Sequence, residues 1–118
     1  MKTVLLIEDD PEFLRTLRLL LWCQGYNVTP SIDIASAMEM IDTRFDFILC
    51  EISLPTHQSF LQFAKKIDPK IQFIFISSTS SQDVMQKALQ HGASCMIKKP
   101  IDHEILHATL LALEILNK

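Results

Sequence analysis

Short, continuously apolar runs alternate with longer amphipathic runs along the whole of this chain. The apolar runs are four to six residues long, and the first of them, Thr3–Ile7, shows no polar alternation of the kind expected for a strand with one wet face. Strands buried on both faces are typical of a parallel sheet. We therefore predict parallel strands over Thr3–Ile7, Tyr26–Thr29, Phe45–Cys50, Ile71–Ile76 and Ser94–Ile97.

The segments between these runs carry helix signals. Asp10 is a side-chain cap, Pro11 stands at the first helical position and Gly25 ends the first helix. Ser80 or Ser81 and Asp102 are the corresponding caps of later helices, and Gly92 is a second stop. The predicted helices are Pro11–Gln24, Asp33–Thr43, Ser59–Ile67, Ser81–His91 and Asp102–Asn117.

Five β–α units in strict alternation predict the α/β class. The expected architecture is a three-layer, doubly wound (βα)5 sandwich with right-handed crossovers around a five-stranded parallel sheet. A length of 118 residues fits one domain over 1–118, and an apolar share of 48% is enough for a packed core.

Composition and charge narrow the classes of function. A net charge of −3 argues against direct nucleic-acid binding, which needs clustered Lys and Arg. No apolar stretch is long enough for a secretory signal or a membrane span. The odd, widely spaced Cys23, Cys50 and Cys95 are interpreted as reduced core residues. We expect a soluble cytoplasmic protein without membrane contact.

Polar residues directly after the predicted strands should meet at one edge of the sheet, because parallel strands share their carboxyl edge. Carboxylates gathered there repel one another unless a cation joins them, and Mg²⁺ prefers such oxygen ligands. Helix capping explains Asp10 sufficiently, but capping alone does not explain the remaining combination. The residues expected at this edge are Glu8, Asp9, Asp10, Glu51, Ser77, Ser78, Thr79, Lys98 and Lys99.

This pattern resembles the receiver domains of bacterial two-component response regulators over essentially the whole chain. The resemblance implies a flavodoxin-like fold with strand order 2-1-3-4-5 and a cis bond between Lys99 and Pro100. The segments that carry it are Leu5–Asp10, Phe45–Pro55, Phe75–Ser78, Gly92–Ala93 and Ile97–Pro100.

The resemblance also implies a role for each residue of the site. Glu8 and Asp9 match the acid pair that binds Mg²⁺, and Glu51 stands where an aspartate accepts a phosphoryl group from a histidine kinase. Ser77 and Lys99 match the residues that bind the phosphoryl oxygens. The implied partners are a histidine kinase, an effector domain or a second receiver, and the domain itself is not expected to be an enzyme.

Three departures from the family pattern stand out. Glu51 is one methylene longer than the usual aspartate, and a displacement of about an ångström can cost about a hundredfold in a positioned reaction. Met96 stands at the switch position, which is commonly aromatic. The loop Thr56–Ser59 lacks the usual Asp-Gly turn, and the segment from Glu51 to Ser77 looks several residues short, so the third helix is expected to be shortened or tilted.

We therefore predict a pseudo-receiver that acts through phosphorylation-independent interaction or is locked by Glu51 in a phospho-mimic state. In that state Lys99 pairs with Glu51. Two alternatives stay open at this point. One is a working receiver phosphorylated at another residue, and the other is a small Mg²⁺-dependent phosphohydrolase.

The last predicted helix carries two further signals. His103, Glu104 and His107 spell the H-E-x-x-H signature of zinc proteases, but no suitably spaced third ligand follows, so we interpret the two histidines as a solvent-facing strip. The apolar residues cover more of the helix than one sheet face can bury. Leu110, Leu111 and Ile115 are therefore predicted to form a partner surface, used by a signalling protein or for a homodimer.

Overall fold

Five strands and five helices alternate along the chain in a computed structural model that describes residues 2–79 and 81–116. Every predicted element is present, with ends that differ from the prediction by a few residues. The elements in chain order are β1 (Thr3–Ile7), α1 (Pro11–Cys23), β2 (Asn27–Ser31), α2 (Ile34–Met40), β3 (Phe47–Glu51), α3 (His57–Ile67), β4 (Gln72–Ser77), α4 (Gln82–Gln90), β5 (Cys95–Lys98) and α5 (His103–Leu116).

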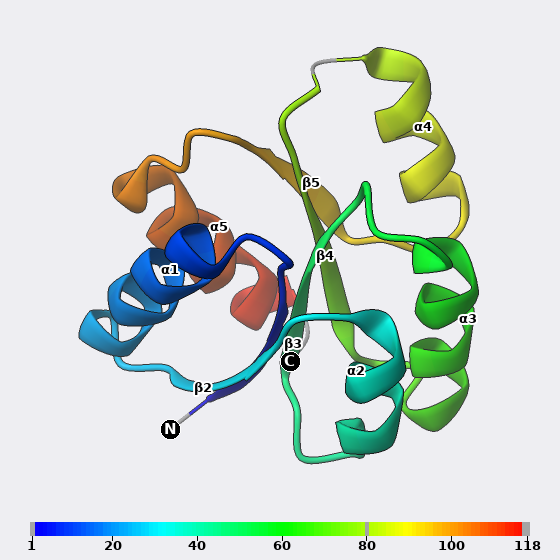
Figure 1. Cartoon of the computed structure of the whole chain (residues 1–118), viewed down its shortest axis with the longest axis horizontal. Helices are drawn as coiled ribbons and strands as arrows, with labels where there is room; N and C mark the ends of the chain where they lie inside the picture. The colour runs from blue at the N-terminus through cyan, green and yellow to red at the C-terminus, as the bar shows by residue number, and fades with distance from the viewer. Residues whose placement is uncertain (1, 80, 117–118) are drawn as a thin grey trace.

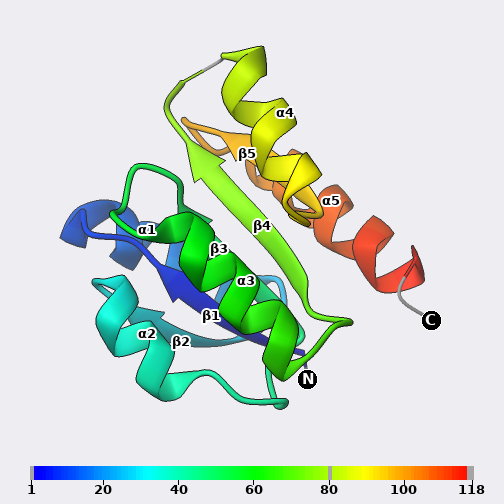
Figure 2. The same cartoon turned by 90° about the vertical axis from the view of Figure 1, so that its right-hand side faces the viewer.

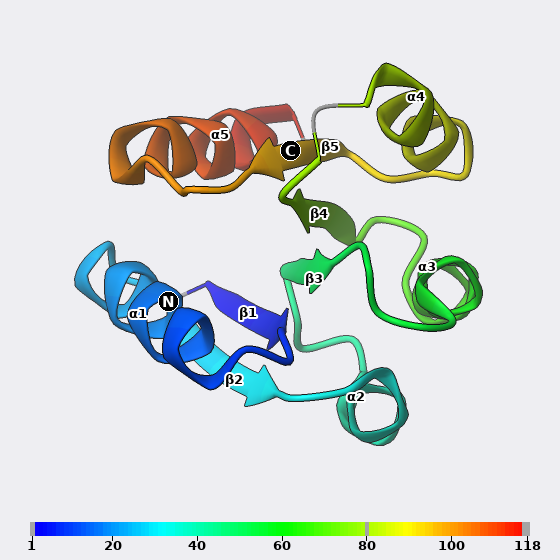
Figure 3. The ribbon, with the colours of Figure 1, turned by 45° about the horizontal axis from the view of Figure 1, so that its top comes forward.

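The strands form one parallel sheet in the order β2-β1-β3-β4-β5, which confirms the predicted topology. Helices α1 and α5 cover one face, and α2, α3 and α4 cover the other (Figure 1). The view in Figure 3 shows the resulting three layers, with the strands between the two groups of helices. The chain order reverses direction across the sheet at β1 and β3, so their carboxyl ends flank the point where α/β proteins build their sites.

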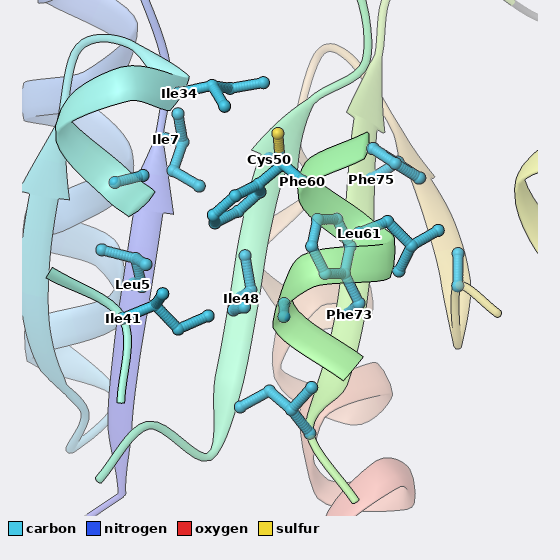
Figure 4. Close-up of a cluster of buried hydrophobic side chains, with 14 of the residues drawn as sticks. Leu5, Ile7, Ile34, Ile41, Ile48, Cys50, Phe60, Leu61, Phe73 and Phe75 are labelled. Carbon is cyan, nitrogen blue, oxygen red and sulfur yellow. The ribbon is translucent and has the colours of Figure 1, made fainter. Parts of the chain in front are cut away.

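Successive residues of each central strand point to opposite faces of the sheet and enter different cores. Leu5 and Ile7 of β1 pack under α2, α3 and α4, whereas Val4 and Leu6 pack under α1 and α5. Figure 4 shows the first of these clusters, in which Phe60 of α3 lies over the sheet. Both faces need apolar side chains, and this explains the continuous apolar runs of the central strands.

The predicted caps hold the helix ends. Asp10 accepts hydrogen bonds from two backbone N–H groups of α1, and Asp102 does the same for α5. Ser81 caps α4 through the N–H of Val84, while Ser80, the alternative cap, lies outside the described residues, as does Asn117, the predicted end of α5. Gly25 ends α1 with a φ of 93°, a conformation that glycine adopts without strain.

Several element ends differ from the prediction by a few residues. β2 continues through Pro30 to Ser31. Proline has no backbone N–H to donate, and it is tolerated here because β2 is an edge strand, with one side that pairs with no other strand. α2 ends at Met40, before the predicted end at Thr43. α3 is not shortened at its start: it begins at His57, two residues before the predicted Ser59, directly after Thr56 in the left-handed region (φ 64°).

Two burial predictions are wrong. Cys23 was expected in the core, but it is exposed at the end of α1, whereas Cys50 is buried and Cys95 is half-buried. Leu110 was expected on a partner surface, but it is completely buried, because Leu106, Leu110 and Leu113 form the inward stripe of α5. Within residues 2–79 and 81–116, no helix has the length and apolarity to cross a membrane.

Candidate functional site

The residues at the carboxyl edge of the sheet are positioned by backbone pairing that continues past the strands. Glu51 is the last residue of β3, and Glu8 directly follows β1. The N–H of Glu8 donates to the carbonyl of Ser31 at 3.0 Å, and the N–H of Lys99 donates to the carbonyl of Ser77 at 2.8 Å. These bonds extend the ladder by one residue on each side, so the side chains of Glu8, Glu51 and Lys99 converge.

Lys99 lies between two buried carboxylates. Its Nζ is 2.8 Å from Oε1 of Glu51 and 3.1 Å from Oε2 of Glu8, and these three residues are called the acid pocket below. The exposed fractions of the side chains are 20% for Lys99, 6% for Glu51 and 1% for Glu8. The ammonium also lies 4.1 Å from the ring centroid of Phe13, at the start of α1, where a cation is attracted to the ring face.

The two carboxylates are satisfied to different degrees. Glu51 uses both oxygens, because Oε2 accepts a hydrogen bond of 2.7 Å from the N–H of Ser53. Glu8 accepts a hydrogen bond of 3.2 Å from the N–H of Asp10 through Oε1. Its Oε2 is buried and lies at ion-pair distance from Lys99, but it accepts no hydrogen bond from the described residues. Glu8 is therefore the less well held of the two.

The pKa values of the acid pocket follow from this difference. Burial raises the pKa of the Glu8 carboxyl, and the opposing ammonium of Lys99 does not fully offset it. Burial acts on Glu51 in the same direction, but Lys99 and the N–H of Ser53 together outweigh it, so the pKa of Glu51 lies below its ordinary value. Burial lowers the pKa of Lys99, but the two carboxylates outweigh that effect and raise it. The Glu51–Lys99 pair is thus ionised at neutral pH.

The other predicted site residues lie around the acid pocket with different exposures. Ser77 is buried, and its hydroxyl accepts from the N–H of Thr79 at 3.0 Å, so in this arrangement it holds the loop after β4. Asp9 is exposed to solvent beside Glu8. Met96 is half-buried in β5 and packs against the core under α2, α3 and α4. The Lys99–Pro100 bond is cis, as the resemblance implies.

Sequence reasoning missed two contributors to the acid pocket. Phe13 is one, because its position at the start of α1 places the ring against Lys99. Ser53 contributes a backbone N–H, which no side-chain pattern can indicate. The only available signal was that Ser53 follows Glu51 by two residues, because a carboxylate often accepts a hydrogen bond from the backbone N–H two residues later in the chain.

The H-E-x-x-H residues do not join this site. His103, Glu104 and His107 all lie on the exposed side of α5. Within the part of the chain that the structure describes, no three His, Cys, Asp or Glu side chains form a group that could hold a metal ion.

A doubly wound sheet in the order 2-1-3-4-5, with carboxylates at the carboxyl ends of β1 and β3 and a lysine after β5, is typical of the class of receiver domains. The chain belongs to this family, because residues 4–111 match the family model described as the response regulator receiver domain. The family predicted from the motifs is therefore confirmed.

Similar proteins support the assignment to this family. The chain is 31% identical over 110 residues to the transcriptional regulatory protein ZraR of Escherichia coli O157:H7. This alignment covers 91% of this chain and 25% of ZraR. It is 30% identical over 101 residues to the two-component response regulator ARR18 of Arabidopsis thaliana. This alignment covers 83% of this chain and 16% of ARR18. The chain thus spans a quarter or less of the length of these two relatives.

Solved structures show the same fold. The receiver domain of the Francisella response regulator 1452 matches with a TM-score of 0.88 and 21% identity over 100% of both chains. NtrX from Brucella abortus, solved in complex with ADP, matches with a TM-score of 0.90 and 20% identity over 99% of this chain and 28% of its own.

Receiver domains typically bind Mg²⁺ at the phosphorylation site, and the donor chemistry here suits that ion. Oε2 of Glu8 is a buried carboxylate oxygen without a hydrogen bond, and Asp9 follows directly. The arrangement suits it less well, because Glu8 and Glu51 both contact Lys99 and no three-ligand group exists among residues 2–79 and 81–116. Binding of Mg²⁺ by Glu8 and Asp9 stays a prediction.

Proposed function

We propose that this receiver domain is a pseudo-receiver, in which Glu51 occupies the phosphoacceptor position and signalling proceeds by phosphorylation-independent interaction. The observation that carries the proposal is the contact of 2.8 Å between Oε1 of Glu51 and Nζ of Lys99. The family resemblance assigns this lysine to a phosphoryl oxygen. Here a carboxylate of the chain itself reaches it.

The state of the Glu51 carboxylate also argues against phosphoryl transfer to it. Each of its oxygens is already engaged, one by Nζ of Lys99 and the other by the N–H of Ser53. The lowered pKa of Glu51 means a weaker base and hence a poorer nucleophile. The extra methylene displaces the oxygens from the position that an aspartate would give them.

Glu51 is an incomplete mimic of a phosphorylated aspartate. It carries about one negative charge and two oxygens, whereas a phosphoryl group carries nearly two charges and three oxygens. In this proposal Glu51 fixes Lys99 and the end of β5 in one arrangement. The implied partners are those of the family, namely a histidine kinase, an effector domain or a second receiver, met in the cytoplasm.

Incubation with Mg²⁺ and acetyl phosphate, followed by intact-mass measurement, tests the proposal. The native protein is expected to keep its mass, and the matched Glu51→Asp variant to gain one phosphoryl group. A gain by the native protein would refute the pseudo-receiver and favour a receiver phosphorylated elsewhere, which peptide mapping would locate. Release of inorganic phosphate at a catalytic rate would instead favour a phosphohydrolase.

The outer side of α5 is the partner surface in this proposal. Leu111 and Ile115 are exposed, as predicted, and Ile105 and Leu116 extend the same surface, while the buried Leu110 is excluded from it. The partner that we propose for this surface is a second copy of the chain, since receivers often dimerise through the face that contains this helix. Sedimentation velocity tests it: the native chain should dimerise, and the Ile115→Glu variant should be monomeric. A native monomer at all concentrations would contradict it.

A further inference from the structure

A cavity of about 460 Å³ lies between α3 and α4, beside the carboxyl ends of β3 and β4. Figure 2 shows these two helices on the same side of β4. The wall of the cavity is apolar, and the volume of the cavity is within the range of about 300–1,000 Å³ that is usual for small-molecule sites. The apolar residues of the wall are Ile52, Leu61, Phe75, Val84 and Ala88.

The rim of this α3–α4 cavity is cationic. Lys87 of α4 lines it, and within the described part of the chain this lysine makes no ion pair. His57 at the start of α3 and His91 after α4 also line it. The described lining contains no Asp or Glu, so the rim offers positive charge without an internal partner.

Both histidines present a defined nitrogen. Nδ1 of His57 lies 3.2 Å from the carbonyl oxygen of Leu54, and Nδ1 of His91 lies 2.6 Å from that of Lys87. A carbonyl oxygen only accepts, so Nδ1 carries the hydrogen in each ring and Nε2 is left as a hydrogen-bond acceptor, which leaves the ammonium of Lys87 as the group that attracts an anion. The His57 ring is also fixed edge-on against Phe75, with centroids 5.4 Å apart.

We propose that the α3–α4 cavity binds a small amphipathic anion, with a flat apolar body and one carboxylate. The apolar wall removes the body from water, and the ammonium of Lys87 receives the charge. A small concave site favours a small molecule over a protein surface or a lipid bilayer. This inference concerns a second site and does not depend on whether Glu51 accepts a phosphoryl group.

The cavity adjoins the acid pocket through two loops. Ser53 lines the cavity and donates its N–H to Glu51, and Thr79 lines it and donates its N–H to Ser77. A bound anion therefore lies against the loops after β3 and β4. Ligand occupancy supplies an input to the domain that needs no phosphoryl chemistry.

Backbone amide NMR with 2-naphthoate and its uncharged counterpart 2-naphthamide tests the proposal. Naphthoate is expected to cause saturable shifts at Leu61, Val84 and Ala88, and to bind about fivefold more tightly than naphthamide because of the partly exposed charge pair. The Lys87→Met variant should lose that preference, and the Lys66→Met variant, which removes an exposed lysine of α3, should keep it.

The Val84→Phe variant fills the cavity and should abolish the shifts with both probes while the rest of the spectrum stays folded. Absence of saturable shifts with the native protein, or shifts confined to α5, would overturn the cavity as a binding site. Equal affinity for the two probes, or an unchanged preference after Lys87→Met, would overturn the assignment of an anion.

Discussion

Replacing Lys99 by Met leaves Glu8 and Glu51 buried beside each other without a positive charge. Their side chains are 1% and 6% exposed, so water cannot take over the role of the ammonium. Methionine keeps much of the length and the apolar contact of the lysine stem. The substitution therefore isolates the effect of the charge.

The expected cost follows from the burial of the three side chains. Removing one partner of a buried ion pair typically costs about 3–5 kcal/mol of the free energy of unfolding. Lys99 is 20% exposed, which places this case near the lower limit, at about 3 kcal/mol. The lost attraction to the ring of Phe13 adds less than about 1 kcal/mol.

The cost should also depend on pH. The native Glu51 has a lowered pKa, so its contribution is present above its unfolded pKa and is lost as pH falls through the folded value. In the variant, burial without Lys99 raises the pKa of both carboxyls, so the variant gains stability relative to the native protein as pH falls. The difference in free energy of unfolding should be larger at about pH 7.5 than at about pH 5.

Urea unfolding followed by far-ultraviolet circular dichroism measures this difference. The matched control is Lys98→Met, which removes the neighbouring exposed lysine and should change the free energy of unfolding by less than about 0.5 kcal/mol. A cost below about 1 kcal/mol for Lys99→Met, or an equal cost at both pH values, would refute the reasoning.

Three smaller predictions concern other parts of the fold. Thr56→Gly relieves a left-handed residue (φ 64°) and should raise the free energy of unfolding by about 0.5 kcal/mol in urea titration, and a decrease would contradict it. Tyr26→Phe removes the hydrogen bond of 3.1 Å to Glu114 and should lower the free energy of unfolding by about 1 kcal/mol, so an unchanged midpoint would show that this bond contributes nothing. The exposed Cys23 should react quickly with a disulfide reagent in the folded protein. Burial raises the pKa of the Cys50 and Cys95 thiols and should slow their reaction, so Cys23→Ser should remove the fast reaction.

The sheet was predictable because its residues have to satisfy two cores at once. β1, β3 and β4 each send alternate side chains to opposite faces, and this produces apolar runs without a polar break. Asp10 and Asp102 then marked helix starts through side-chain capping, and Gly25 marked a helix end. The strand order came from the family resemblance, because apolar runs alone do not specify which strands are neighbours.

The limits of the prediction lie where packing between distant segments decides. The apolar breadth of α5 correctly indicated exposed residues such as Ile115, but it did not identify which ones, and Leu110 proved to be part of the inward stripe with Leu106. The pairing of Lys99 with Glu51 followed from charge and strand order, and it is present. The second contact of Lys99, to Glu8, depends on how closely the ends of β1 and β5 approach each other.

We propose that Glu51 alone prevents the acid pocket from accepting a phosphoryl group. Backbone amide spectra of the native protein and of the Glu51→Asp variant, with Mg²⁺ and the phosphoryl analogue beryllofluoride, test it most directly. We expect unchanged signals at Ser53, Ser77 and Lys99 in the native protein and clear shifts at all three in the variant. The same shifts in the native protein, or none in either protein, would contradict it.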